Sequence, residues 1–231
     1  MKKIINADDF GLNRSVNQAI TLCFRKGYIN QTTIMTNMPA YEEAVALSKE
    51  YNFFDKVGLH VNLDEGIPIT NEMKCNFHFC KNDRFIKGSI KGLKKFYLNR
   101  YDRKCVEKEV EAQMAHYICS GFPLLHLDSH HHIHTNYSIL RIILKIAKKH
   151  QFRTIRICAF HSSDSFFKKL YKRILNSYVR LYFSTTDLFL TRRDQYQPES
   201  KSIEIMTHPD IIEGQLVEII KRNPLTINSY K

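Results

Sequence analysis

Short apolar runs alternate along the chain with longer segments whose apolar residues recur at helical spacing. Several of the short runs are continuous rather than strictly alternating, which is typical of strands covered on both faces of a sheet. On this pattern we predict strands at residues 3–7, 32–37, 56–63, 123–127, 154–159 and 202–206.

The longer segments carry helix start and stop signals. Ser15 is a residue type that caps helices, and Gly27 follows the segment that it opens. In the central segment Val106, Val110 and Met114 repeat four residues apart, as one face of a helix does. We predict helices at residues 15–26, 105–120, 136–150, 165–181 and 211–222.

This order of elements predicts an α/β fold with a parallel sheet, either open or closed into a barrel. Residues 71–103 interrupt the order, because they are polar and basic and hold Gly88 and Gly92. We interpret them as a long insertion or lid. No linker or repeat divides the chain, so a single domain over residues 1–231 is expected.

The composition is that of an ordinary globular protein, with 43% hydrophobic and 25% charged residues. No run of about 18 apolar residues exists, so neither a membrane span nor a membrane partner is expected. The start MKKIINADDF reaches two aspartates before a signal-peptide core could form, which favours a cytoplasmic protein. Its six cysteines are then expected to be free thiols.

Positive charge is the one unusual feature of the composition, with 35 Lys and Arg against 23 Asp and Glu and a net charge of +12. Such an excess favours anionic partners. Much of it lies in residues 81–104, which we interpret as a solvated surface rather than a polyanion site. The segment 165–181 is basic as well, and its role is not assigned by the pattern.

Residues that could perform chemistry gather at the ends of predicted strands. Asp8 and Asp9 follow the first strand, His60 lies in the third, and His208 follows the last. The stretch HLDSHHHIH at residues 126–134 places five imidazoles in nine residues. Because functional side chains collect at the carboxyl ends of parallel strands, these groups are expected to share one edge of the sheet.

Each of these features alone has an unremarkable explanation. The aspartates could cap the next helix, and a single strand histidine is more often a satisfied residue of the interior. Together, carboxylates and imidazoles supply ligands for a divalent cation, with acids and bases left over for proton transfer. Spacing does not choose the ligand in the cluster, since His126, His130 and His134 are four residues apart in turn.

The motifs NADDFG, GLHVNL with DEGIPIT, HLDSHHHIH and IEIMTHPD, in this order, resemble the YdjC-like carbohydrate deacetylases, which include chitooligosaccharide deacetylases. The segment TIMTN at residues 33–37, followed by a helix at 40–47, also fits. The resemblance runs from residue 3 to about residue 160 and resumes at 202–210. It implies an irregular TIM-like (β/α) barrel related to NodB-type polysaccharide deacetylases.

The resemblance also implies an activity and a site. Such enzymes remove acetyl groups from N-acetylated sugars with water activated by a bound divalent metal, usually magnesium. Carried over by motif, the metal ligands are Asp9, His60 and His130, with Asp8 as the base and His208 as the acid.

Three further residues are expected to bind substrate or support the ligands: Asp128, His132 and His134. A ligand set of one Asp and two His favours zinc by its chemistry, whereas the resemblance favours magnesium. A homodimer is common in the family, and the positive charge would suit a phosphorylated sugar.

Two other functions remain open. A metal-dependent phosphoesterase would use similar ligands on an α/β barrel, although such sites often hold two metals and more carboxylates. A nucleic-acid-binding protein using residues 81–104 would leave the aspartates and histidines unexplained, so nucleic acid is not the expected partner.

Overall fold

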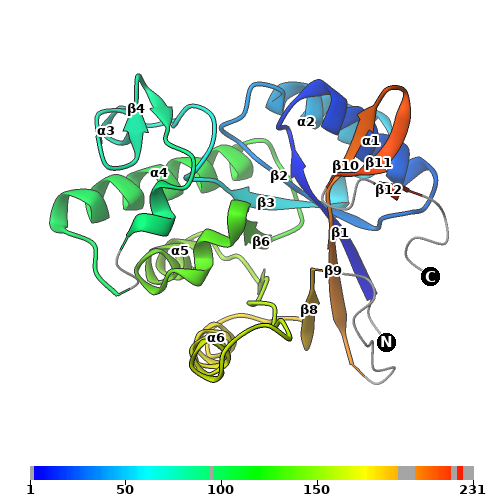
Figure 1. Ribbon diagram of the computed structural model, residues 1–231. Helices are drawn as coiled ribbons and strands as arrows, with labels where there is room; N and C mark the ends of the chain where they lie inside the picture. The colour runs from blue at the N-terminus through cyan, green and yellow to red at the C-terminus, as the bar shows by residue number, and fades with distance from the viewer. Residues whose placement is uncertain (1–2, 94–95, 192–200, 220–222, 226–231) are drawn as a thin grey trace.

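The computed structural model describes residues 3–93, 96–191, 201–219 and 223–225. Its centre is a curled parallel sheet of seven strands in the order β7-β6-β3-β2-β1-β9-β8 (Figure 1). These strands are β1 (Lys3–Phe10), β2 (Gln31–Ile34), β3 (Val57–Val61), β6 (His126–Ser129), β7 (Thr154–Ile155), β8 (Leu188–Leu190) and β9 (Ile203–Thr207). All six predicted strands are present, most of them with shifted or shorter bounds, and β8 was not predicted.

The barrel expected from the sequence is present only in part. Every ladder in the large sheet is parallel, as an α/β barrel requires. The edge strands β7 and β8 do not pair with each other. A parallel bridge joins Thr154 to Ser184, and β8 pairs with β9 at the other edge of the sheet. The result is a half-barrel, and it brings the carboxyl ends of β1, β3, β6 and β9 to one edge.

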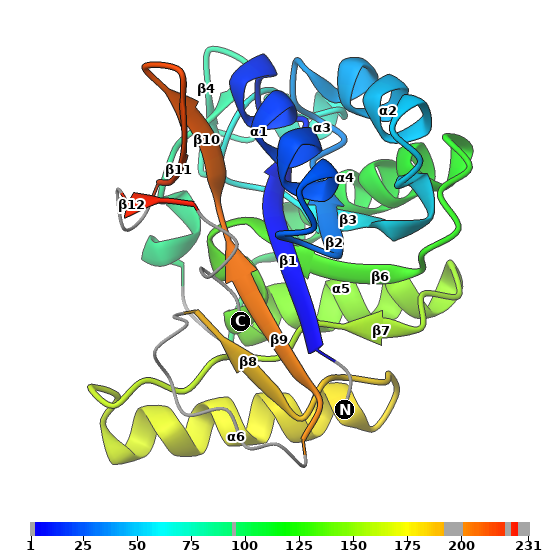
Figure 2. The ribbon, with the colours of Figure 1, turned by 90° about the vertical axis from the view of Figure 1, so that its right-hand side faces the viewer.

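Helices cover the outside of the curled sheet (Figure 2). They are α1 (Arg14–Arg25), α2 (Tyr41–Glu50), α4 (Arg100–Cys119), α5 (Tyr137–Lys149) and α6 (Phe166–Arg180), with 3-10 turns at η1 (Phe54–Lys56) and η3 (His130–Thr135). Asn13, rather than Ser15, caps α1 through its side chain. Asn136 and Ser165 cap α5 and α6 in the same way. No described helix is long and apolar enough to cross a membrane.

The predicted insertion forms a small subregion beside the end of β3. It holds α3 (Asn71–Lys74), the hairpin of β4 (Cys80–Lys81) and β5 (Arg84–Phe85), and η2 (Ser89–Gly92). The insertion ends earlier than expected, because Arg100–Arg103 already belong to α4. The backbone N–H of Gly88 donates to Asp64 over 2.6 Å, which ties this segment to the end of β3.

The helix predicted at residues 211–222 is wrong over the part that the structure describes. Residues in this region form an antiparallel hairpin of β10 (Pro209–Ile212) and β11 (Gln215–Glu218), which pairs with β12 (Asn223–Pro224). Glu213 and Gly214 both have positive φ, of 49° and 76°. A two-residue turn of this kind favours a hairpin and is incompatible with a continuing helix. Residues 220–222 lie outside the described residues.

Candidate active site

The two aspartates at the end of β1 turn to different partners. The pairing of β1 with β2 is irregular between Ala7 and Phe10, and Asp9 has a left-handed φ of 69°. Such a conformation is costly for a residue other than glycine and is typical of functional positions. Asp8 therefore points into the interior, whereas Asp9 points toward the histidines at the neighbouring strand ends.

Asp9, His60 and His130 come together, as predicted. Oδ1 of Asp9 lies 3.2 Å from Nε2 of His60 and 2.9 Å from Nδ1 of His130. One ligand atom from each residue lies within 4.8 Å of the others. A carboxylate and two imidazoles at this separation are a donor set for a divalent cation. Their hydrogen bonds lower the pKa of Asp9 well below its usual range, although burial opposes the shift.

A second carboxylate stands behind each imidazole. Nδ1 of His60 lies 2.5 Å from Oδ1 of Asp128, and Nε2 of His130 lies 3.2 Å from Oε2 of Glu65. Metal-binding histidines commonly donate their other N–H in this way, which fixes the tautomer and the ring orientation. The two nitrogens left over are the ones that face Asp9. The residues present therefore fit a cation at this position.

Carboxylates raise the pKa of both imidazoles of the site. Burial alone would lower the pKa of His60, but the charge and hydrogen bond of Asp128 raise it to about 10. Burial is likewise outweighed at His130, whose pKa is raised by Asp9 and Glu65. The raised pKa values favour the protonated imidazoles, so a cation competes with protons for these nitrogens.

Arg156 joins the carboxylates beneath the site, and sequence reasoning missed it. Its side chain is fully buried and donates two hydrogen bonds to Asp8, of 2.6 and 2.7 Å. It also lies 2.7 Å from Oδ2 of Asp128 and 2.5 Å from Oε1 of Glu204. Burial would lower the pKa of this guanidinium, but the three carboxylates raise it well above its usual value. The available signal was a lone charge in each of two apolar strands, TIRICA and IEIM.

His208 at the end of β9 lies beside this network. Its Nε2 is 4.0 Å from Oδ2 of Asp8, and its Nδ1 is 3.6 Å from Oε1 of Glu218 on the unpredicted hairpin. Burial would lower the pKa of His208, but the Glu218 and Asp9 carboxylates raise it. These carboxylates therefore favour the protonated form of the imidazole.

The other predicted histidines lie in the turn after β6. His131 and His132 have positive φ, of 48° and 54°, which changes the direction of the chain twice. His134 is buried, and its Nδ1 lies 2.6 Å from the Ser129 hydroxyl. His132 packs its ring edgewise on Phe189. Burial lowers the pKa of both imidazoles, that of His134 to about 4, so both are neutral at pH 7.

The structure separates the three histidines that spacing could not distinguish. His130 contacts Asp9, whereas His126 bonds Thr154 over 2.9 Å and His134 bonds Ser129. Predicted support residue Asp128 contacts the ring of His60.

Comparisons with known proteins identify the family of this chain. A family model described as YdjC-like protein matches residues 2–226. The chain belongs to the YdjC-like family. The resemblance expected from the motifs is confirmed, and with it the class of enzyme to which the family's curated members belong.

Curated relatives carry the name carbohydrate deacetylase. The relative from Vibrio cholerae is 36% identical over 177 residues, which cover 72% of this chain and 67% of that protein. The relative from Halalkalibacterium halodurans is 33% identical over 217 residues, or 94% of this chain and 88% of that protein. A crystal structure from Enterococcus faecalis V583, of a protein named for cellobiose-phosphate cleavage, has a TM-score of 0.71 and 26% identity, covering 92% of this chain and 82% of that chain.

Proposed function

We propose that this YdjC-like protein is a metal-dependent carbohydrate deacetylase that removes acetyl groups from N-acetylated sugars of the chitooligosaccharide type. The observation that supports it is the convergence of Asp9, His60 and His130, with Asp8 and His208 beside them. Relatives named carbohydrate deacetylase, which align over most of the chain, support the same reaction.

Asp9, His60 and His130 would hold one divalent cation. When bound, the cation supplies a positive charge that polarises an acetamide carbonyl and makes nearby water more acidic. The family resemblance favours Mg²⁺, while two nitrogen donors favour Zn²⁺. Asp128 and Glu65 support this site, since each accepts the remaining N–H of an imidazole ligand.

Asp8 acts as the general base in this proposal. The Arg156 guanidinium and the Asn6 amide, 2.8 Å from Oδ1, hold its carboxylate in one orientation. A fixed carboxylate beside the cation site can accept the proton of an attacking water molecule. Arg156 gives this carboxylate a positive partner that cannot be deprotonated.

His208 acts as the general acid. An amide nitrogen leaves poorly unless it is protonated, so the departing sugar amine needs a proton donor. The raised pKa of His208 keeps that proton available, and the side chain is 18% exposed, so substrate can reach it. Nε2 of His208 lies 4.0 Å from Oδ2 of Asp8, so one acetamide group can contact both side chains.

A metal-dependent phosphoesterase is the second candidate. The structural relative named for cellobiose-phosphate cleavage favours it, as does the positive charge of the chain. The site holds few free carboxylates for a second metal, since Asp8, Asp128 and Glu204 all face Arg156. We therefore rank deacetylation first.

The test is amine release from N,N′-diacetylchitobiose and from its 6-phosphate, with phosphate release measured in the same samples. The protein is stripped with chelator and reloaded with Mg²⁺ or Zn²⁺. Asp8→Asn should lower kcat by about 10²- to 10⁴-fold and keep metal binding, whereas His130→Ala should lose the metal. His150→Ala, a change at the far end of α5, is the matched control. Phosphate release without amine release would favour the phosphoesterase.

A further inference from the structure

Helix α6 exposes large apolar side chains along its outer face. These residues recur at spacings of three, four and seven positions, so they form one stripe on the helix. They are Phe166 (74% exposed), Phe167 (79%), Leu170 (43%), Ile174 (58%) and Leu181 (72%), the last just past the helix end. The opposite face, with Leu175 and Val179, is buried against the domain. One helix thus has two apolar faces, and the described residues cover only one of them.

Such exposure is unusual for a globular protein. Single apolar residues at a surface need no explanation, but a contiguous stripe marks a surface that binds something. Two phenylalanine side chains here are more than 70% exposed to water, which is unfavourable for apolar groups. A partner that covers them would remove this cost. In Figure 2 this helix lies along one side of the molecule, away from α1 and α2.

Cations flank the stripe on one side. Lys169, Arg173 and Arg180 are exposed and lie on one face, because they are separated by four and seven positions. The helix contains no Asp or Glu between residues 165 and 181. Among the described residues no carboxylate pairs with Lys169 or Arg173, whereas Lys168 and Lys172 pair with Asp164.

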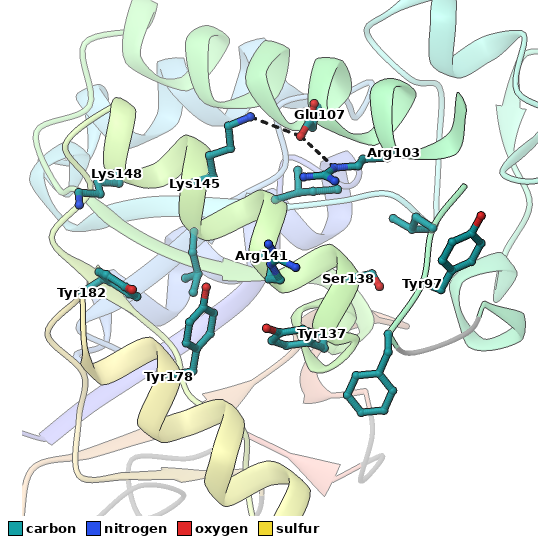
Figure 3. A pocket seen from close by; sticks show the side chains of 14 residues that line it. Tyr97, Arg103, Glu107, Tyr137, Ser138, Arg141, Lys145, Lys148, Tyr178 and Tyr182 are labelled. Carbon is teal, nitrogen blue, oxygen red and sulfur yellow. Dashed lines mark hydrogen bonds and ion pairs between the residues drawn. The ribbon is translucent and has the colours of Figure 1, made fainter. Parts of the chain in front are cut away.

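Tyrosines and a basic pocket flank the other side. Tyr178 of α6 and Tyr182, just past the end of this helix, face α5 across a cavity of about 460 Å³ (Figure 3). Arg141, Lys145 and Lys148 line it from α5, and Lys148 lies 5.5 Å from the Tyr182 ring. The one carboxylate of the lining, on Glu107, is already paired with Lys145 and Arg103. The pocket is therefore positively charged and of a size that suits a small polar group such as a lipid headgroup.

We propose that α6 docks the protein on the surface of an anionic phospholipid bilayer. An apolar stripe with cations on one flank and tyrosines on the other is the pattern of a helix that lies in the membrane interface. The apolar residues would enter the acyl boundary, while Lys169, Arg173 and the α5 cations meet phosphate groups. Each cation near an anionic surface strengthens such binding.

The charge argues against a second copy of the chain as the occupant. Two α6 helices packed face to face would bring like-charged rows together with no carboxylate between them. A bilayer of anionic lipid has the complementary charge. That no described helix can span a membrane does not oppose this proposal, because a helix that lies on the surface does not cross the bilayer.

Docking would also fix the position of the candidate active site. The Tyr171 hydroxyl on α6 donates to the carbonyl of Thr135 over 2.8 Å, directly after the histidine turn. This hydrogen bond ties the helix to the segment beside the candidate active site.

The experiment is co-sedimentation of the full-length protein with phosphatidylcholine vesicles, with and without phosphatidylglycerol, at low and high salt. Two double variants remove the two features separately: Phe167→Ser with Ile174→Ser, and Lys169→Glu with Arg173→Glu. Their matched controls are Phe77→Ser, at a residue that is 73% exposed on the insertion, and Lys26→Glu with Lys49→Glu on α1 and α2. Circular dichroism checks that each variant is folded.

The wild type and both controls should sediment with anionic vesicles and not with neutral ones. Each α6 variant should bind at least about tenfold more weakly. Equal binding to neutral vesicles, or unchanged binding in the Phe167→Ser, Ile174→Ser variant, would overturn the proposal. So would light scattering that shows a dimer of the wild type lost in that variant, or a nucleic acid that binds the wild type more tightly than the vesicles do. None of these readouts depends on deacetylation.

Discussion

Arg156 donates two hydrogen bonds to the Asp8 carboxylate, and both partners are almost completely buried. The guanidinium comes from the segment after β7 and the carboxylate from β1, which lies four strands away in the sheet order. The contact therefore crosses the interior of the half-barrel. It connects the proposed base to the Asp128 carboxylate that supports His60.

The fork shape of this contact leads to the first prediction. Arg156→Lys keeps the charge but cannot hold both oxygens of Asp8 in one plane. We expect kcat to fall by about 100-fold with a smaller change in KM, because a misplaced base affects the reaction more than binding. Steady-state kinetics on an N-acetylated sugar measure this. Arg153→Lys, at an exposed neighbouring position, should behave like the wild type. Full activity of Arg156→Lys would show that Arg156 has no role in positioning Asp8.

Glu65 gives a second prediction, which concerns metal affinity rather than turnover. Its carboxylate lies 3.2 Å from Nε2 of His130, and the hydrogen bond with His130 lowers the pKa of Glu65. Glu65→Gln keeps an acceptor but removes the charge. Metal affinity should weaken by about 10- to 100-fold, as for other partners of metal-binding histidines. Competition with a coloured chelator measures the change, with Glu50→Gln as a surface control. Unchanged affinity would mean that Glu65 does not support the ligand.

The sequence was sufficient to predict which residues of the candidate site meet at the strand ends. Asp9, His60 and His130 follow or belong to apolar runs, and parallel strands bring their carboxyl ends to one edge. The choice of His130 from the cluster came from the family motif, because its spacing was equal to that of its neighbours. The structure distinguishes them through the two positive-φ residues His131 and His132, which local pattern does not reveal.

Arg156, Glu204 and Glu218 could not be predicted in the same way. A single charge in an apolar strand shows that a partner exists but does not identify it, since the partners lie 48 and 148 residues away. Glu218 was predicted to lie on a helix, because the apolar residues from 211 to 222 fit a helical repeat as well as a strand repeat. The positive φ values of Glu213 and Gly214 favour a hairpin, and this hairpin places Glu218 beside His208.

The pair of His208 and Glu218 leads to the third prediction, on pH dependence. A general acid must be protonated, so activity should fall as pH rises through the pKa of His208. That pKa is raised in the folded protein, in part by Glu218, so the loss begins at a higher pH than for an ordinary histidine. Glu218→Gln removes this contribution, and the alkaline limb of kcat/KM should move to lower pH. Glu213→Gln, in the turn of the same hairpin, is the control. An alkaline limb that stays in place would exclude His208 as the group that titrates.

The last prediction concerns stability in acid. Burial lowers the pKa of His134 to about 4, so between pH 6.5 and 4 the unfolded chain binds a proton there that the folded protein does not. This residue therefore lowers the free energy of unfolding as pH falls through that window, and the loss reaches about 3 kcal/mol at pH 4. His134→Gln lacks this proton, so its free energy of unfolding should fall less between pH 7 and pH 4 than that of the wild type. Urea unfolding at the two pH values measures the difference, and His116→Gln on α4 is the control. Only the change in the free energy of unfolding with pH is compared, so a cost of the substitution that is the same at both pH values cancels. An equal change in the two proteins would show that His134 does not resist protonation.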